Sequence, residues 1–185
     1  GSNSVTVTAS GATVNITGGE VISESSSAVL AKDNGTVNIS GGTVKTTDES
    51  DNYYCAAFAR SGGTINVSGG EVSAANGYGL VAVSDGTVTV SGGNVAGVAA
   101  HENANAKAII TGGRITKDVY VNNGAAMIIS GGIFDVEIQQ EWCAEGYEPA
   151  DHDNGTYGVK LHYVAEINGV PYASLAAAVD AAKTG

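Results

Sequence analysis

One short phrase recurs six times along the chain, and this repeat constrains the fold more than any other feature. Each copy is an alternating apolar and polar segment that ends in two adjacent glycines, and the pairs begin at Gly18, Gly41, Gly69, Gly92, Gly112 and Gly131. Successive pairs are 23, 28, 23, 20 and 19 residues apart. A self-similar unit of this length is typical of a solenoid, in which each unit packs only against its neighbours.

Apolar residues alternate with polar ones inside each unit, and a period of two indicates β-strands. The apolar positions are Val14/Ile16, Val37/Ile39, Ile65/Val67, Val88/Val90, Ala108/Ile110 and Met127/Ile129. A second apolar patch precedes each phrase from the second onward, at 28–31, 56–59, 80–83, 98–100 and 119–121, and predicts another strand of the coil. Because this period excludes helical repeats, and the leucine-rich phrase is missing, we expect an all-β fold. Within this class we expect a single-stranded parallel β-helix of about six coils over residues 1–138.

The glycine pairs are expected at the corners between strands. There the backbone needs a positive φ or a sharp bend that a side chain would obstruct. A phosphate-binding role is not favoured, because no GxGxxG or GxxxxGK[ST] phrase follows a strand and opens a helix.

The chain after the sixth phrase has a different pattern. Residues 139–164 predict a hairpin cap, in which Asn154 and Gly155 form a type I′ turn. Residues 165–185 predict a strand and a short helix that Ser174 caps, with Lys183 in its last turn. We expect this last segment to begin a following module.

Charge and cysteine content exclude several classes of function. The chain of 185 residues has 8 Lys and Arg against 19 Asp and Glu, a net charge of −11, so no nucleic acid partner is expected. No run of 18 apolar residues occurs, so no membrane insertion is expected. Cys55 and Cys143 are predicted to be free thiols, because about three rungs would separate them and a disulfide needs Cα atoms within about 7 Å.

The longest unit carries an insertion at 45–55 that is the first candidate for a ligand site. Adjacent coils would bring its tyrosines close to the tyrosine of the next turn, beside several carboxylates, and aromatic faces with polar groups are typical of glycan or protein sites. The candidate ligand-binding residues are Tyr53, Tyr54, Tyr78, Asp48, Glu49 and Asp51. The alternative is that the insertion is an ordinary surface loop.

Two outward-facing arrays are further candidates. One is a grid of polar side chains, Thr13/Asn15/Thr17, Thr36/Asn38/Ser40, Thr64/Asn66/Ser68 and Thr87/Thr89/Ser91. This grid either binds a sugar polymer or ordered water, or serves only as a ladder of hydrogen bonds between rungs. The other is a column of Leu30, Phe58, Val81, His101 and Tyr120. If this column faces outward, it is a candidate surface for contact with another protein. If the register of the strands is shifted by one residue, its side chains lie in the core instead.

No catalytic constellation is visible in the sequence. The column after the glycine pairs holds Glu20, Thr43, Glu71, Asn94 and Arg114, without two adjacent acids. The three histidines, His101, His152 and His162, have no nucleophile partner at a suitable spacing and are expected at the surface. We expect no enzyme activity, no cofactor and no metal site, because the Asp151–Asp153–Gly155 spacing does not complete a calcium loop.

The repeat phrase and the tail together resemble the pectin-lyase-like right-handed β-helix modules of large surface or secreted proteins from anaerobic gut bacteria. The tail carries most of this resemblance, in Ile129–Asp135 (ISGGIFD), Trp142–Leu161 (WCAEGYEPADHDNGTYGVKL) and Ala165–Gly185 (AEINGVPYASLAAAVDAAKTG). Such modules combine a last coil, a hairpin cap and the opening of the next β-helix.

The resemblance implies a function as well as a fold. It implies a right-handed helix and a secreted or cell-wall-attached, extracellular location. We expect a non-catalytic adhesive or stalk module that contacts a glycan or a host or bacterial surface protein and adjoins further modules of the same polypeptide. The alternative is a fragment of a polysaccharide-processing lyase or glycosidase whose catalytic residues lie elsewhere.

Overall fold

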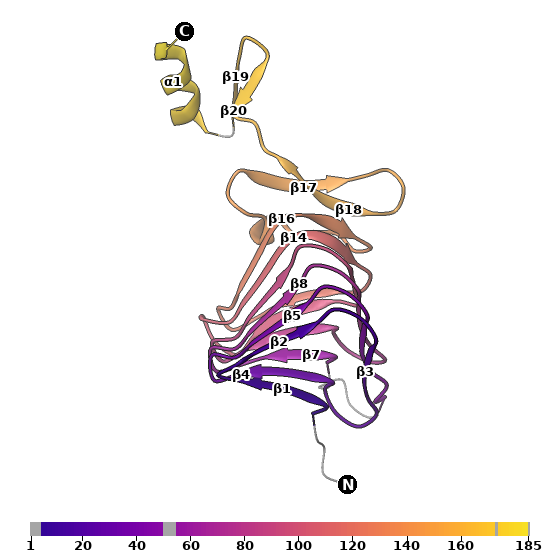
Figure 1. Cartoon of the computed structure of the whole chain (residues 1–185). Helices are drawn as coiled ribbons and strands as arrows, with labels where there is room; N and C mark the ends of the chain where they lie inside the picture. The colour runs from indigo at the N-terminus through magenta and orange to yellow at the C-terminus, as the bar shows by residue number, and fades with distance from the viewer. Residues whose placement is uncertain (1–4, 50–54, 173, 185) are drawn as a thin grey trace.

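The chain folds into a parallel β-solenoid of about five turns, closed by an antiparallel strand pair and followed by one short helix (Figure 1). The computed structural model describes residues 5–49, 55–172 and 174–184. The fold class predicted from the repeat is confirmed. Figure 1 shows the coils stacked from the N-terminal end toward the hairpin, with the terminal helix beyond it.

One side of every coil is a six-stranded parallel sheet, called here the β1 sheet. Its strands follow the order of the chain: β1 (Val7–Ser10), β4 (Val29–Lys32), β7 (Ala57–Ala59), β10 (Leu80–Val83), β13 (Val98–His101) and β15 (Val119–Val121). The apolar patches that precede the glycine phrases lie in the last five of these strands, as predicted.

The glycine phrases form the other two sides of the coil. The strands before the glycines stack as β2 (Thr13–Ile16), β5 (Thr36–Ile39), β8 (Thr64–Val67) and β11 (Thr87–Val90). The strands after them stack as β3 (Glu20–Ser23), β6 (Thr43–Thr46), β9 (Glu71–Ala74) and β12 (Asn94–Val95). The two stacks join into one sheet because β14 (Lys107–Ile115) runs through the corner and pairs with both β11 and β12. Strand β16 (Ala126–Phe134) also runs through the corner and pairs with β14 along its length.

The alternating apolar side chains fill the interior in columns. Val14, Val37, Ile65 and Val88 are register partners from rung to rung, and Ala108 and Met127 continue the column. Val37, Ile65 and Val88 are fully buried. Burying a Val or Ile side chain stabilises the fold by about 1.5–3 kcal/mol, so each added coil contributes its own share of core.

The two glycines of each pair are required for different reasons. A Cβ on Gly92 would lie 2.4 Å from the carbonyl oxygen of Ser68 on the preceding rung, although the φ of Gly92 is ordinary. Gly93 has a φ of +81° and its Cβ would lie 2.7 Å from the Gly70 oxygen. The first glycine therefore allows the close approach of two rungs, and the second also allows a left-handed backbone.

The opposite corner, between the β1 sheet and the next strand, was not identified from the sequence. It uses Asp, Asn and Ser in the left-handed region, for example Asp33 and Asn34 with φ of 51° and 61° and Ser84 and Asp85 with φ of 43° and 69°. Asn and Asp tolerate this conformation because their short side chains bond locally. Glycine takes the left-handed position only in some coils, at Gly62 and Gly124, so no recurring glycine pair marks the corner in the sequence.

The C-terminal end of the solenoid is covered. Short helix η1 (Gln140–Trp142) brings Trp142 into the core cluster beside Phe134. Strands β17 (Tyr147–Asp151) and β18 (Tyr157–Leu161) form the predicted antiparallel hairpin, and Tyr157 pairs with Phe134 of the last coil.

The turn of this hairpin differs from the prediction. A type I′ turn needs a positive φ at both central residues. Asp153 and Gly155 have φ of 59° and 79°, but Asn154 does not share this conformation. The Asn154 side chain instead accepts hydrogen bonds from the amide and hydroxyl of Thr156, at 3.0 and 2.7 Å, and this fixes a longer loop.

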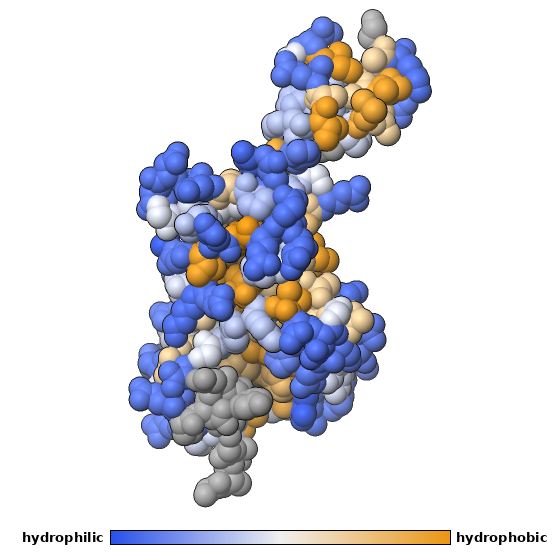
Figure 2. Space-filling view, turned by 180° about the vertical axis from the view of Figure 1, so that it is seen from behind, coloured by the Kyte–Doolittle hydropathy of each residue, from blue (hydrophilic) through white to orange (hydrophobic). Residues whose placement is uncertain are grey.

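The terminal unit is a second hairpin followed by the helix. Strands β19 (Ala165–Ile167) and β20 (Val170–Tyr172) are joined by Asn168 and Gly169, both with positive φ, so the Asn-Gly hairpin signal belongs here. Helix α1 (Leu175–Thr184) starts as predicted, because the Ser174 hydroxyl accepts the Ala177 amide at 3.2 Å. Figure 2 shows apolar surface on this unit.

Candidate functional site

The outward-facing residues of the β1 sheet form a small apolar cluster separate from the core inside the coils. The register Leu30–Phe58–Val81–Ala99–Tyr120 runs across five rungs. Cys55, Val81, Val83 and Ala99 are buried in this cluster, and Phe58 and Tyr78 pack against it. The predicted column therefore does face away from the core.

The predicted place of His101 in that column was wrong. Ala99 occupies the fifth-coil position, while His101 pairs with Val83 two residues further along the same face. The error arose because the turn between β13 and β14, residues 102–106, is two residues longer than the turn between β10 and β11, residues 84–86, so counting back from the glycine pair misplaces a residue by two. A shift of two keeps a side chain on the same face of a strand, which is why His101 still belongs to this surface.

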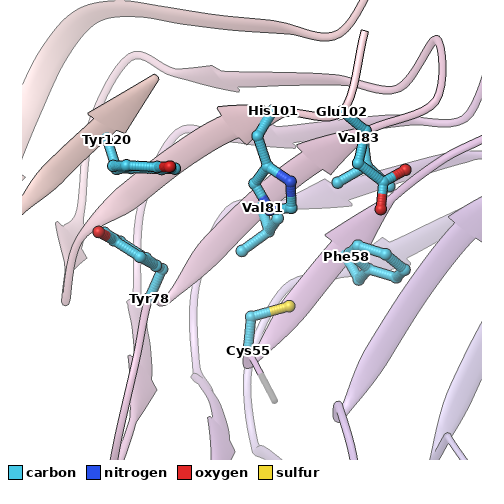
Figure 3. A pocket seen from close by; sticks show the side chains of 8 residues that line it. All are labelled: Cys55, Phe58, Tyr78, Val81, Val83, His101, Glu102 and Tyr120. Carbon is cyan, nitrogen blue, oxygen red and sulfur yellow. The ribbon is translucent and has the colours of Figure 1, made fainter. Parts of the chain in front are cut away.

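A pocket of about 330 Å³ opens on this face, and we call it the aromatic pocket (Figure 3). The side chains that line it are Cys55, Phe58, Tyr78, Val81, Val83, His101, Glu102 and Tyr120. They come from four adjacent strands of the β1 sheet, β7, β10, β13 and β15, and from the turns beside them. Figure 3 shows the two tyrosines on one side, Phe58 on the other and Val81 between them.

The aromatic side chains of the pocket hold one another in place. The rings of Tyr78 and Tyr120 stack with centroids 6.1 Å apart, and the His101 ring meets Tyr120 edge-on at 6.2 Å. Such pairs contribute about 0.5–1.5 kcal/mol beyond their burial. Because the rings are carried by a rigid parallel sheet, the pocket is formed before any ligand arrives.

The polar groups of the pocket are few. Glu102 accepts a hydrogen bond from the Ser84 hydroxyl at 2.6 Å. The Tyr120 hydroxyl accepts one from Asn122 at 2.8 Å. Partial burial raises the pKa of Tyr78, and the negative charge of Asp118 raises it further, so this phenol is neutral at physiological pH. The lining in the described part of the chain includes no Lys or Arg.

The first candidate site, in the insertion at 45–55, is only partly visible. Tyr78 lies in the aromatic pocket. Asp48 is buried, and the Glu49 carbonyl accepts a hydrogen bond from Asn76 at 2.8 Å, which confirms that the two turns are neighbours. The remaining predicted residues, Asp51, Tyr53 and Tyr54, lie outside the described residues.

Several pocket residues were missed in the sequence. Val83 follows Val81 by two residues in the same strand, so its side chain lies on the same face. The period of two could therefore have predicted it. Glu102 and Cys55 lie outside the strands, and no pattern in the sequence connects them with this face.

The polar grid on the β2 stack is a hydrogen-bonded ladder. Asn38 donates to Asn15 and Asn66 donates to Asn38, both at 2.9 Å. Beyond Asn66 the equivalent position is taken by Thr89 and then by Ile109, so the ladder of amides ends at Asn66. These amides therefore bind one another, which supports the structural interpretation of the grid.

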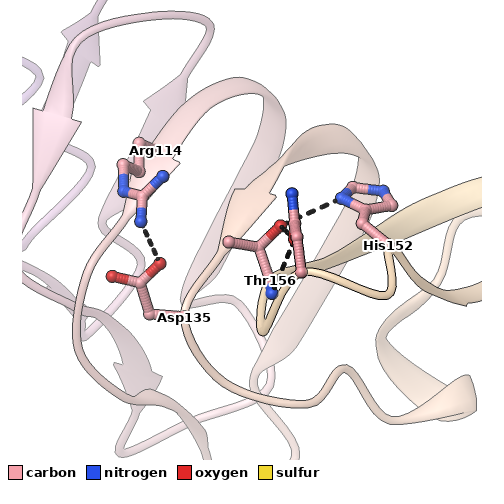
Figure 4. A network of polar contacts seen from close by, with 5 residues as sticks. Arg114, Asp135, His152 and Thr156 are labelled. Atoms are coloured by element: carbon pink, nitrogen blue, oxygen red, sulfur yellow. Dashed lines mark hydrogen bonds and ion pairs between the residues drawn. The ribbon is translucent and has the colours of Figure 1, made fainter.

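The column after the glycine pairs has the predicted register. Glu20, Thr43, Glu71, Asn94 and Arg114 are successive partners along the β3 stack. Arg114 pairs with Asp135 at 2.6 Å (Figure 4). The guanidinium is therefore already engaged by an acid of the next coil.

The other two histidines are exposed, as predicted, and both have polar partners in the cap. His152 is 3.2 Å from the Thr156 hydroxyl (Figure 4). His162 is 2.5 Å from Glu148, and this contact, with Lys160, lowers the pKa of the Glu148 carboxyl. His101 differs from them because it lies partly buried in the aromatic pocket.

Both cysteines are free, as predicted. Burial raises the pKa of Cys55 to about 12, so it lines the pocket as a neutral, apolar group. In the described residues no three His, Cys, Asp or Glu side chains are grouped so as to hold a metal ion. Within the same ranges, no helix has the length and hydropathy of a membrane span.

Comparison of the chain with protein-family models, with curated proteins and with solved structures finds no match. The chain is therefore identified by its fold alone, as a parallel β-solenoid of about five turns with repeated coils.

Proposed function

We propose that this chain is a non-catalytic adhesive module of a secreted or surface-attached bacterial protein, and that it binds a glycan at the aromatic pocket. The observation that carries the proposal is the pocket itself, a preformed hollow with aromatic walls on the outer face of a rigid sheet. Its volume of about 330 Å³ is within the usual range of small-ligand sites.

The chemistry of the lining supports a glycan ligand. The C–H faces of a sugar ring pack against aromatic rings, and a few polar groups orient the ring. Tyr120 lines the pocket with 39% of the residue exposed, and His101 and Glu102 are polar groups at the same pocket. The resemblance to pectin-lyase-like surface modules supports an extracellular, wall-attached or secreted location and neighbouring modules of the same polypeptide.

The proposal is tested with a glycan array and mucin binding. The purified chain is compared with Tyr120→Ala and Tyr78→Ala, and with Tyr163→Ala as a matched control, because Tyr163 is exposed and is not part of the pocket lining. We expect the first two variants to lose binding and the control to keep it. Thermal unfolding of each variant shows whether a loss is due to misfolding.

Two outcomes would overturn the proposal. If no glycan binds the unmodified chain, the glycan assignment is wrong and a protein ligand or a spacer role replaces it. If a glycan binds equally well to folded Tyr120→Ala and Tyr78→Ala, the binding site lies elsewhere on the solenoid.

A further inference from the structure

The aromatic pocket combines aromatic walls with one acidic side chain. The only charged side chain in its described lining is Glu102, which is exposed and held by Ser84. Asp118 adds a second carboxylate beside Tyr78. Two basic residues flank the lining in the sequence, and neither is part of it. Lys117 donates instead to the carbonyl oxygens of Ala74 and Ala75, at 3.0 and 3.3 Å. Arg60 follows Phe58 by two residues, and its charge contributes to lowering the pKa of Asp33.

This charge balance selects against anions. A bound carboxylate or sulfate would lie near Glu102 with no Lys or Arg of the described lining to compensate it. The net charge of −11 acts in the same direction over longer distances. A cation would instead neutralise Glu102 and interact with the negative faces of the rings.

Most of the described lining of the pocket is apolar. Phe58, Val81, Val83 and the neutral Cys55 thiol supply apolar surface, and the polar side-chain atoms are those of His101, Glu102 and the two tyrosine hydroxyls. A primary ammonium has three donors that would need partners when buried. An alkylated ammonium has fewer donors or none, so it fits an apolar, aromatic and acidic pocket better.

We infer that the aromatic pocket binds an alkylated ammonium group of the choline type, carried as a substituent by the glycan. The inference rests on the proposed function, because it uses the same pocket and names the chemical group recognised there. Tyr120 and Phe58 supply the ring faces and Glu102 supplies the counter-charge.

The test uses choline chloride and its neutral isostere 3,3-dimethyl-1-butanol, which has the same shape without the charge. Binding to the full chain is measured by titration calorimetry at low and high salt. Cation–π attraction of about 0.5–2 kcal/mol predicts that choline binds roughly 2–30 times more tightly than the isostere. Equal affinity for the two probes, or no choline binding, would overturn the inference.

Three variants locate the site. Tyr120→Leu keeps an apolar side chain but removes the ring face, and Glu102→Gln removes the charge, so both should weaken choline binding severalfold. Glu166→Gln is the matched control, because Glu166 is an exposed carboxylate of the terminal unit, and it should have no effect. Choline binding that is unchanged in folded Tyr120→Leu and Glu102→Gln would place the site elsewhere.

Competition separates this inference from the proposed function. If a glycan binds through Tyr120 and choline does not displace it, the ammonium inference fails and glycan binding stands. If choline binds at the pocket and no glycan binds, glycan binding fails. Vesicles of phosphatidylcholine present the same group in a lipid. If the chain binds these vesicles but not a phosphocholine-substituted polysaccharide, the inference that a glycan carries the group is wrong.

Discussion

The glycine pairs allow a stability experiment in which close packing and backbone conformation are separated. Gly92 is limited only by close approach, since its φ is ordinary and an added Cβ would lie 2.4 Å from the Ser68 oxygen. Gly18 is the equivalent residue of the first coil, and its Cβ would meet nothing within 4 Å. Gly19 has a φ of +76°, and a Cβ added to it would also have no atom within 4 Å. Gly93 has both a positive φ and a close contact for an added Cβ.

The structure sets the expected cost of Gly92→Ala. Relieving the clash requires the two rungs to separate by about 1 Å, because ordinary contact with a Cβ begins at 3.4 Å. The hydrogen bonds from Ser91 to Val67 at 2.8 Å and from Asn94 to Gly70 at 2.9 Å would then stretch beyond bonding distance. Two weakened hydrogen bonds between rungs and the overpacking predict a loss of about 2–4 kcal/mol.

The four variants should therefore differ in a defined order. Gly18→Ala should change the free energy of unfolding by less than about 1 kcal/mol, and Gly19→Ala should cost about 1–2 kcal/mol for its left-handed backbone. Gly93→Ala should be at least as damaging as Gly92→Ala. Urea unfolding followed by far-UV circular dichroism measures each value.

Equal stability of Gly18→Ala and Gly92→Ala would refute the reasoning, because only the second has a rung beneath it. Fraying of the first coil is a competing explanation for a mild Gly18→Ala effect. Gly41→Ala controls for it, since its Cβ would lie 2.7 Å from Thr17 of that first coil. A large loss in Gly41→Ala shows that the first coil is part of the cooperative unit.

Three further predictions concern the thiols, the cap and the ladder. A thiol reagent at pH 8 should modify Cys143 but not the buried Cys55, whose pKa is about 12. In urea without reductant, both thiols should react. If no thiol reacts in urea, the two cysteines form a disulfide. Glu148→Gln should lower the melting temperature at pH 7 and have a smaller effect near pH 3. The stability that comes from the lowered pKa of Glu148 is present above the ordinary Glu pKa of about 4.5 and disappears as the pH falls through its folded pKa, so an equal effect at both pH values would contradict the assignment. Asn38→Ala should cost about 1–3 kcal/mol in urea unfolding and Asn15→Ala about half as much, because they remove two ladder bonds and one; equal costs would argue against the ladder.

Much of the solenoid could be predicted because its information is local and repeated. The period of two places Val37 and Ile65 inward, and the recurrence of Gly92 at a fixed distance from its strand places the corner. A residue that is assigned to the wrong position in one coil can be recognised by comparing that coil with the next. The corner at Asp33 and Asn34 was missed because residues other than glycine adopt its left-handed conformation.

The candidate site could be predicted only in part. The sequence placed Phe58, Val81 and Tyr120 in one column, but it left open whether the column faces outward or into the core, because strands such as β10 are apolar throughout. The contact of these residues with Glu102 and Cys55 could not be predicted, because these two lie in connections whose lengths vary between coils. His101 was placed two residues away from its true partner for the same reason.

The sequence alone determined the type of coil, its three-part pattern of apolar patch, alternating strand and glycine corner, and the choice of residues that face inward. These properties depend on side-chain alternation and backbone freedom, which act within a few residues. Only the tertiary structure decided which side chains meet across rungs. The pocket is formed by residues from Cys55 to Tyr120, and their contact depends on the hydrogen-bond register between strands whose partner residues are 18 to 23 residues apart in the chain.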